Sequence, residues 1–283
     1  MPLPVLPSGL RKRANLTRFF LPRERLIHRA EITILGSGTS MGVPTLGCTC
    51  RVCTSTDPRD RRTRPSIAVT WAGHRVLIDT GPDFRMQALR EGIDHVDAVL
   101  YTHSHADHIL GLDDLRPLSF KHKNKIPLYA DDEAASVIER IFDYTFDPNS
   151  PYPTRARVEM HRLGTSVEVE GAVFQRVPLT HGRLEVAGFR FGNAAYLTDM
   201  NDIPESSLAL LENLDVVILD ALRKTPHSSH ATLEQAVGFV ARMQPRRAFF
   251  THMSHDLLHA ETNNELPEHI QLAYDGLRIP FEI

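Results

Sequence analysis

The sequence His103-Ser104-His105-Ala106-Asp107-His108 comes directly after the apolar run Val96–Tyr101. That run is rich in β-branched and aromatic residues, which indicates a buried strand with the histidine cluster at its carboxyl end. Residues two apart point to the same side of an extended backbone, so we expect His103 and His105 to face one pocket. Asp107 and His108 are adjacent and need a turn or a helix start. Imidazole and carboxylate donors in this pattern predict two neighbouring metal sites rather than a hydrated loop.

The length and composition are those expected of an ordinary water-soluble protein. It has 283 residues, 42% hydrophobic and 24% charged, enough for one large domain or two small ones. The net charge of −3 exerts no global attraction on nucleic acid or anionic membranes. No apolar run reaches the roughly 18 residues of a membrane-spanning helix, and no signal peptide is apparent. Three cysteines, an odd number, argue against a disulfide framework, so the expected compartment is the reducing cytoplasm.

Residues 1–30 form a basic N-terminal extension in which Glu24 is the one acidic residue before the first predicted strand. Two interpretations stay open: a solvated, partly disordered extension, or a basic arm that contacts phosphate-bearing ligands or a partner. The remainder, residues 31–283, is expected to form one domain.

Three thiols at short spacing follow the first predicted strand and its glycine-rich loop. Cys48, Cys50 and Cys53 would make a three-sulfur claw for zinc that lacks one ligand. The alternative is three reduced cysteines without a metal. If the claw holds zinc, its fourth donor must come from a distant part of the chain.

Polar side chains of ligand type recur immediately after predicted strands. Apolar or alternating runs predict strands at 31–35, 66–71, 75–79, 96–101, 126–130, 166–169, 173–178, 185–191, 194–197, 216–219 and 246–250. Helical patterns cover 83–91, 112–122, 131–142, 204–211 and 232–243. The segment 142–153 mixes aromatic residues with prolines, so no continuous element can run through it. It is either a surface loop pinned by its aromatic side chains or a lid over the site.

The residues that follow these strands include Asp79, His181, Asp199 and His252. Strands and then helices in each half of the chain predict two similar sheets packed face to face, with helices outside. This α/β architecture is an αββα sandwich. From Glu31 onward the order of these motifs resembles the metallo-β-lactamase superfamily.

The resemblance implies a dinuclear metal site. It assigns His103, His105 and His181 to the first metal, Asp107, His108 and His252 to the second, and Asp199 to a bridging position between them. A bridging carboxylate holds two dications about 3.5–4 Å apart, where they can share a hydroxide and grip a phosphoryl oxygen. Imidazole and carboxylate ligands accept either manganese or zinc.

Within the superfamily the chain resembles the PhnP-like phosphodiesterases, which act on a phosphoribosyl cyclic phosphate in the carbon–phosphorus lyase pathway. The glycine-rich loop 36–44, the cysteine claw, the histidine cluster and Thr251–His255 match that family in order. The resemblance implies a structural zinc on Cys48, Cys50 and Cys53, completed by His255. If Thr251–His255 begins a helix, His252 and His255 lie on neighbouring faces and serve both sites.

The expected function is hydrolysis of a small cyclic or diester phosphate by a metal-dependent phosphodiesterase. Because histidine titrates near neutral pH, His230 is the expected proton donor, and His227 is the alternative. Asp107 is also expected to be a catalytic residue. A ribonuclease Z-like tRNA-processing endonuclease is a rival, although the acidic balance from Glu31 onward disfavours nucleic acid. A non-catalytic metal-stabilised binding subunit and a thioester or β-lactam hydrolase are weaker rivals. The sequence is compatible with a homodimer.

Overall fold

The computed structural model describes residue 1 and residues 28–121 and 124–283. Nearly all of the predicted basic extension, residues 1–30, lies outside these described residues. The first strand starts at Arg29, before the boundary at Glu31 that the sequence predicts. The backbone N–H groups of His28 and Ile283 each donate to the carbonyl oxygen of the other at 3.0 Å.

Two seven-stranded sheets form the centre of the molecule. The first has the order β14-β1-β2-β3-β4-β5-β6 and the second β13-β12-β11-β10-β9-β8-β7. The first sheet is built from β1 (Arg29–Gly36), β2 (Ser66–Trp71), β3 (His74–Ile78), β4 (Ala98–Leu100), β5 (Ile126–Ala130), β6 (Val158–Arg162) and β14 (Arg278–Glu282). The second is built from β7 (Ser166–Val169), β8 (Ala172–His181), β9 (Leu184–Phe191), β10 (Ala194–Leu197), β11 (Val216–Asp220), β12 (Arg247–Thr251) and β13 (Ile270–Leu272).

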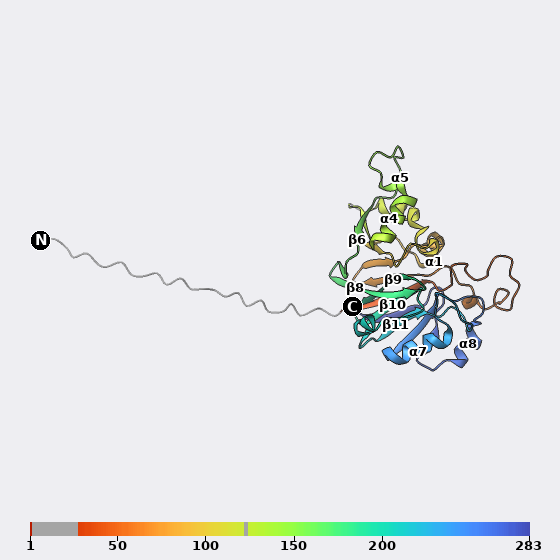
Figure 1. Ribbon diagram of the computed structural model, residues 1–283. Helices are drawn as coiled ribbons and strands as arrows, with labels where there is room; N and C mark the ends of the chain where they lie inside the picture. The colour runs from red at the N-terminus through yellow and green to blue at the C-terminus, as the bar shows by residue number, and fades with distance from the viewer. Residues whose placement is uncertain (2–27, 122–123) are drawn as a thin grey trace.

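Helices cover the outer faces of both sheets. The α-helices are α1 (Phe84–Glu91), α2 (Ala106–Ile109), α3 (Arg116–Ser119), α4 (Asp132–Ile141), α5 (Asp143–Phe146), α6 (Glu205–Leu208), α7 (Leu233–Met243) and α8 (His259–Glu265), with 3-10 turns η1 (Pro58–Asp60), η2 (Leu112–Leu115) and η3 (Ala209–Leu211). In Figure 1, α1 and α4 lie on one side of the paired sheets and α7 and α8 on the other. Within the described part of the chain, no helix has the length and apolar character needed to cross a membrane.

The hydrophobic core follows these layers. Between the sheets, inward-facing side chains such as Ile32, Phe174 and Phe191 are fully buried. A second cluster packs α7 against β10, β11 and β12, and a third packs α1 and α4 against the first sheet. The central strands, such as β4, β10 and β11, are buried along their whole length, because one face packs against the other sheet and the opposite face against helices. The predicted αββα sandwich is confirmed.

The sheet topology brings distant loops to one edge. In the first sheet β3, β4 and β5 run parallel, and in the second β10, β11 and β12 do so. Because parallel strands have their carboxyl ends at the same edge, the polar residues that follow them converge there.

The helical prediction for 112–122 is confirmed over 112–119, where the 3-10 turn η2 (Leu112–Leu115) continues directly into α3 (Arg116–Ser119). The condition on which one helix start would serve both metal sites is not met. Residues 251–255 do not begin a helix: β12 ends at Thr251, and α8 starts only at His259. The segment 142–153 contains only the short α5, in agreement with the prediction that its prolines interrupt it.

Candidate metal centre

The histidine cluster contributes donors from both sides of a strand-to-helix junction. His103 and His105 precede α2, and Asp107 and His108 lie within it. The described residues contain four groups of metal-type donors in which all atoms lie within 4.8 Å of one another. Two of them include residues of the histidine cluster, one is the cysteine claw with His255, and one is Asp220, His230 and His252. Of the first two, one is His103, His105, His181 and Asp199, and the other is Asp107, His108, Asp199 and His252.

Asp199 belongs to both groups. Its Oδ2 lies 3.1 Å from Nε2 of His108, and its Oδ1 lies 3.2 Å from Nε2 of His252 and 3.9 Å from Nε2 of His103. The two oxygens of one carboxylate therefore face imidazoles that belong to both groups. This is the position that the sequence predicts for a bridging ligand.

Hydrogen bonds leave the inward nitrogen of several imidazoles available as a ligand. The Nδ1–H of His108 donates to Asp79 Oδ2 at 2.7 Å, and that of His181 donates to the carbonyl of Ser229 at 2.8 Å. Since a carboxylate and a carbonyl only accept, each Nε2 keeps its lone pair. Thr102 holds Asp79 through two bonds of 2.8 and 2.9 Å. Such partners orient metal-binding histidines in proteins.

Several buried donor atoms have no hydrogen-bond partner among the described residues. They include Nε2 of His103, His108 and His252 and Oδ2 of Asp107. A buried polar atom without a partner is costly, and ligation to a divalent cation satisfies an imidazole lone pair and a carboxylate oxygen at once. The donor set therefore fits two divalent cations.

The electrostatics of the site favour charge of both signs in close contact. Burial alone would raise the pKa of Asp199, but the imidazoles of His252 and His108 hold that pKa well below its usual range. Burial opposes charge on His252, yet Asp199 and Asp107 raise the pKa of His252 to about 9. The neighbouring imidazoles thus keep the Asp199 carboxylate ionised.

Three residues of the site adopt left-handed backbone angles. Asp79, Asp199 and His252 have φ values of 67°, 54° and 58°. Each follows a strand, so the turn redirects its side chain towards the metal donors. For residues other than glycine this conformation is strained, and such strain concentrates at functional sites.

His230 lies directly beside the donors. Its ring stacks on His252 with centroids 4.5 Å apart, and it lies 4.7 Å from the ring of His181. Its Nδ1–H donates to Asp220 Oδ2 at 2.6 Å. His227, the alternative proton donor, is farther out, 5.1 Å from His230 between ring centroids.

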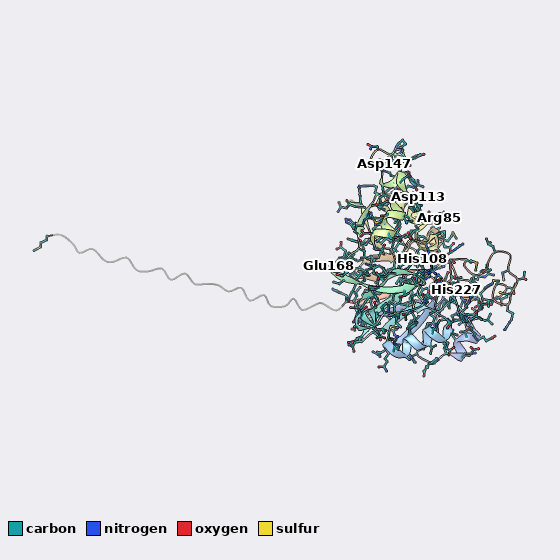
Figure 2. All side chains as sticks on the ribbon, viewed as in Figure 1. Arg85, His108, Asp113, Asp147, Glu168 and His227 are labelled. Atoms are coloured by element: carbon teal, nitrogen blue, oxygen red, sulfur yellow. The ribbon has the colours of Figure 1, made fainter. Side chains whose placement is uncertain are left out.

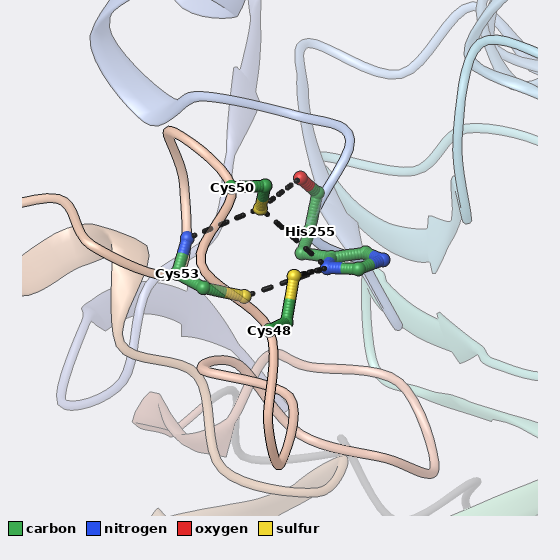
Figure 3. Close-up of side chains that lie close together, drawn as sticks. All are labelled: Cys48, Cys50, Cys53 and His255. Carbon is green, nitrogen blue, oxygen red and sulfur yellow. Dashed lines mark hydrogen bonds between the residues drawn. The ribbon is translucent and has the colours of Figure 1, made fainter.

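The cysteine claw closes around a fourth donor. Nδ1 of His255 lies 3.2, 3.6 and 3.4 Å from the sulfurs of Cys48, Cys50 and Cys53 (Figure 3). A tetrahedral zinc with bonds of roughly 2.0–2.3 Å places nitrogen and sulfur ligands about 3.5 Å apart. The N–H of Cys53 donates to the sulfur of Cys50 and lowers the pKa of Cys50 to about 7. The four donors therefore fit a closed structural zinc.

A buried ion pair fixes the loop 252–258, which carries His252 and His255. Arg62, which is 1% exposed, pairs with Asp60 at 3.1 Å and donates to the carbonyls of Ser254 and Leu257 at 2.8 and 2.5 Å. These bonds flank His255 and hold residues 252–258 in an irregular loop rather than a helix. An irregular loop thereby carries ligands for both sites.

Comparison with known proteins identifies the fold family. A model of the beta-lactamase superfamily domain matches residues 74–253. The chain belongs to the metallo-β-lactamase superfamily. The resemblance predicted from the motifs is thus confirmed. Every metal donor that the sequence predicts lies in one of the two His/Asp groups or in the claw.

Similar proteins refine that placement. The crystal structure of a diphosphatase from the PhnP family is 52% identical, with a TM-score of 0.87, and covers 91% of this chain and 99% of its own. This metallo-β-lactamase superfamily chain is therefore PhnP-like. Zinc-bound PqqB from Methylobacterium extorquens shares the fold, with 20% identity, a TM-score of 0.73, and coverage of 88% of this chain and 99% of its own.

A longer relative is the octanoyltransferase of Porphyromonas gingivalis, 41% identical over 249 residues, which are 86% of this chain and 50% of that protein. The chain spans about half the length of the curated relatives that it matches first.

Sequence reasoning missed the role of Asp220 beside His230. Asp220 is the last residue of β11, and Asp79 directly follows β3. A carboxylate at the end of an apolar strand was the sequence signal that could have identified Asp220. The pairing itself depends on how the loop 221–231 returns over the strand end, which local patterns do not specify.

Proposed function

We propose that this chain is a metal-dependent phosphodiesterase that hydrolyses a small cyclic or diester phosphate. The observation that carries the proposal is the shared carboxylate of Asp199, which lies 3.1 and 3.2 Å from His108 and His252 of one donor group and 3.9 Å from His103 of the other. Hard oxygen and nitrogen donors, rather than a bridging thiolate, suit phosphoryl chemistry. The PhnP-family diphosphatase, with 52% identity, supports the same class of metallo-hydrolase.

Seven residues would hold a pair of manganese or zinc ions: His103, His105, His181, Asp107, His108, His252 and the bridging Asp199. Bound there, the ions would lower the pKa of a water nucleophile and neutralise charge on the phosphoryl oxygens. The chain itself orients the imidazoles through Asp79 and the Ser229 carbonyl. It also excludes bulk water from the buried donors.

His230 is the residue placed to donate a proton to the leaving oxygen. Asp220 accepts from its Nδ1–H, which orients the ring and leaves Nε2 to carry the transferable proton. The stacking of His230 on His252 places it beside the donors without making it one of the seven.

A diphosphate link is a second candidate target, favoured by the description of the 52% identical neighbour as a diphosphatase. Its cleavage needs the same parts: charge neutralisation at phosphorus and a proton for the departing oxygen. Ribonuclease Z-like activity has less support, because human tRNase Z shares only 19% identity with this chain.

The test is hydrolysis of bis(p-nitrophenyl) phosphate and of a thioester, each with the metal-loaded protein and after chelation. We expect turnover of the diester only, lost with chelator and restored by Mn²⁺ or Zn²⁺. A thioesterase that ignores the diester would contradict the proposal. So would diester hydrolysis that survives complete removal of metal.

A further inference from the structure

The loop between β11 and α7 carries two basic side chains, Arg223 and His227. Arg223 is half-buried, and among the described residues its guanidinium has no carboxylate partner. It donates instead to the carbonyl oxygens of Thr225 and Pro226 at 3.2 and 2.8 Å. A guanidinium that is bonded only to neutral carbonyls keeps an uncompensated positive charge, which an anion can neutralise.

The ring of His227 is held by its own loop. Its Nδ1 accepts from the backbone N–H of Ser229 at 3.3 Å, so the hydrogen of the neutral ring is on Nε2. Among the described residues Nε2 has no hydrogen-bond partner, and the side chain is exposed. Partial burial, followed by the positive charges of His230 and Arg223, lowers the pKa of His227. The ring therefore offers an N–H donor to an anion whether or not it is protonated.

The same loop is built against the metal donors. The backbone of Ser229 donates its N–H to His227, and its carbonyl accepts from Nδ1 of His181 at 2.8 Å. A Cβ atom on Gly182 would lie 3.2 Å from Cβ of Ser229, so the two segments are in close contact. One residue, Ser229, thus fixes His227 relative to the donor His181.

Two ring contacts also link His227 to the donors. Its ring centroid lies 5.1 Å from that of His230, which stacks on the donor His252 at 4.5 Å. Figure 2 shows His227 on the same side of the molecule as the donor His108. From the metal centre outwards, His252 is followed by His230 and then by His227. Arg223 comes next to His227, because it donates to the carbonyl of the preceding residue.

A diphosphate has its parts in the same order. If the phosphorus that is attacked lies at the metal donors and the bridging oxygen faces His230, the second phosphate lies one bond farther out. That phosphate is negatively charged at neutral pH, and charge-assisted hydrogen bonds from basic side chains are strong contacts for phosphate.

We propose that Arg223 and His227 form a subsite that binds the second phosphate of a diphosphate, on the leaving-group side of the bond that is cleaved. The inference rests on the proposed function and selects the diphosphate link as its target. His230 then serves the bridging oxygen, and the subsite holds the phosphate that departs with it.

The experiment compares α,β-methylene-ADP with AMP by calorimetric titration of the full-length metal-loaded protein. The methylene bridge prevents hydrolysis, and the two ligands share base and ribose. Because a diphosphate also binds metal ions more tightly than a monophosphate, the diagnostic quantity is the ratio of the two Kd values. We expect the wild type to favour α,β-methylene-ADP. Arg223→Gln should reduce that preference by about 10- to 100-fold, as expected for a lost charge-assisted hydrogen bond.

Matched variants separate the subsite from other effects. Arg246→Gln removes an equal charge, on a side chain 85% exposed, directly before β12, whereas the donor His252 follows the carboxyl end of that strand. It should leave the ratio unchanged. Arg223→Lys keeps the charge without the planar fork and should retain part of the preference. Bound metal is counted in each variant, because damage that displaces His181 would release metal.

His227→Ala tests the subsite without removing the bonds between Arg223 and the loop. It should reduce the preference for α,β-methylene-ADP by about 2- to 10-fold, as expected for one ordinary hydrogen bond. If Arg223→Gln folds poorly or loses metal, the result with His227→Ala decides.

Equal affinity of the wild type for the two ligands would overturn the subsite. So would a preference that is unchanged in both Arg223→Gln and His227→Ala, or one that falls as far in Arg246→Gln, since it would then reflect net charge alone. Failure of the wild-type protein to hydrolyse bis(p-nitrophenyl) phosphate instead overturns the proposed function. The two failures are distinguishable because binding is measured without turnover.

Discussion

Oδ2 of Asp220 lies 2.6 Å from Nδ1 of His230, and the same oxygen accepts from the backbone N–H of Met200 at 3.1 Å. The carboxylate is thus fixed by the main chain and in turn fixes the imidazole. Among the described residues only Nδ1 of His230 has a hydrogen-bond partner, so in the proposed function Nε2 is the nitrogen that would act on a phosphate ester.

His230→Ala should keep both catalytic metals and lower turnover of alkyl phosphodiesters by roughly 10²–10⁴-fold, the usual cost of losing a general acid. The loss should shrink for nitrophenyl esters, because nitrophenolate departs without protonation. Steady-state kinetics on both substrate types, with metal analysis of the variant, measures this. Equal losses on both would assign His230 to binding, and loss of metal would make it a ligand.

His227→Ala is the control for the choice of histidine. It removes the outer imidazole while leaving the Asp220–His230 pair intact. We expect no dependence on the leaving group. If His227→Ala shows that dependence and His230→Ala does not, the proton donor is His227.

Asp199→Ala should reduce diesterase turnover to below about one hundredth and release at least one metal ion, because each donor group loses its shared carboxylate. The protein should stay folded, since the sheets pack independently of this side chain. Turnover, bound metal and circular dichroism should be measured on one preparation. Near-normal activity with two metals per chain would refute the bridging role.

Cys50→Ser should remove one zinc and lower the melting temperature by roughly 5–10 °C, because metal binding to a closed site contributes folding free energy. Thr49→Ala is the matched control: Thr49 is exposed and lies between Cys48 and Cys50. Zinc should be quantified alongside thermal unfolding. An unchanged zinc content in Cys50→Ser would exclude the claw as a metal site.

His259 should make stability depend on pH. Burial, followed by Arg59 and Arg62, lowers the pKa of His259 from 6.5 to about 4 in the folded protein. Between these values the unfolded chain binds a proton that the folded chain does not. Its contribution to the free energy of unfolding is therefore complete above pH 6.5 and is lost as the pH falls towards 4, by at most about 1.4 kcal/mol per pH unit.

His259→Gln should flatten this part of the pH dependence. Denaturant unfolding at several pH values between 4 and 7 measures the difference from the wild type. His161→Gln replaces an exposed histidine of β6 and should follow the wild-type curve. Parallel curves for His259→Gln and the wild type would show that His259 does not contribute.

The hydrophobic periodicity of the sequence was sufficient to predict many of the strands. The apolar runs at Val216–Leu219 and Ile126–Ala130 predict strands close to those observed, because buried parallel strands have an unambiguous pattern. The short strands Ile270–Leu272 and Arg278–Glu282 were missed. Their pairing with β12 and β1 comes from long-range contacts that a local pattern does not contain.

The candidate site could likewise be predicted only in part from local sequence patterns. Donors such as His105 and His252 were predictable because ligand-type residues at strand ends converge in parallel sheets. The loop 252–258 was not, because its conformation depends on Arg62, a residue about 190 positions away that donates to the carbonyl of Ser254. Tertiary hydrogen bonds there override the local preference for a helix.

The cysteine claw has a consequence for how the protein is made. Cys48 and His255 are separated by 207 positions, and His252 lies close to the same end of the chain. At about 5–20 residues per second, a ribosome needs roughly 10–40 s to add the imidazole after the first thiol. The nascent chain therefore carries its thiols without their partner for that time. The claw is complete only once residue 255 has been added, and the second donor group only once residue 252 has been added, so metal ions that the chain meets earlier find incomplete sites.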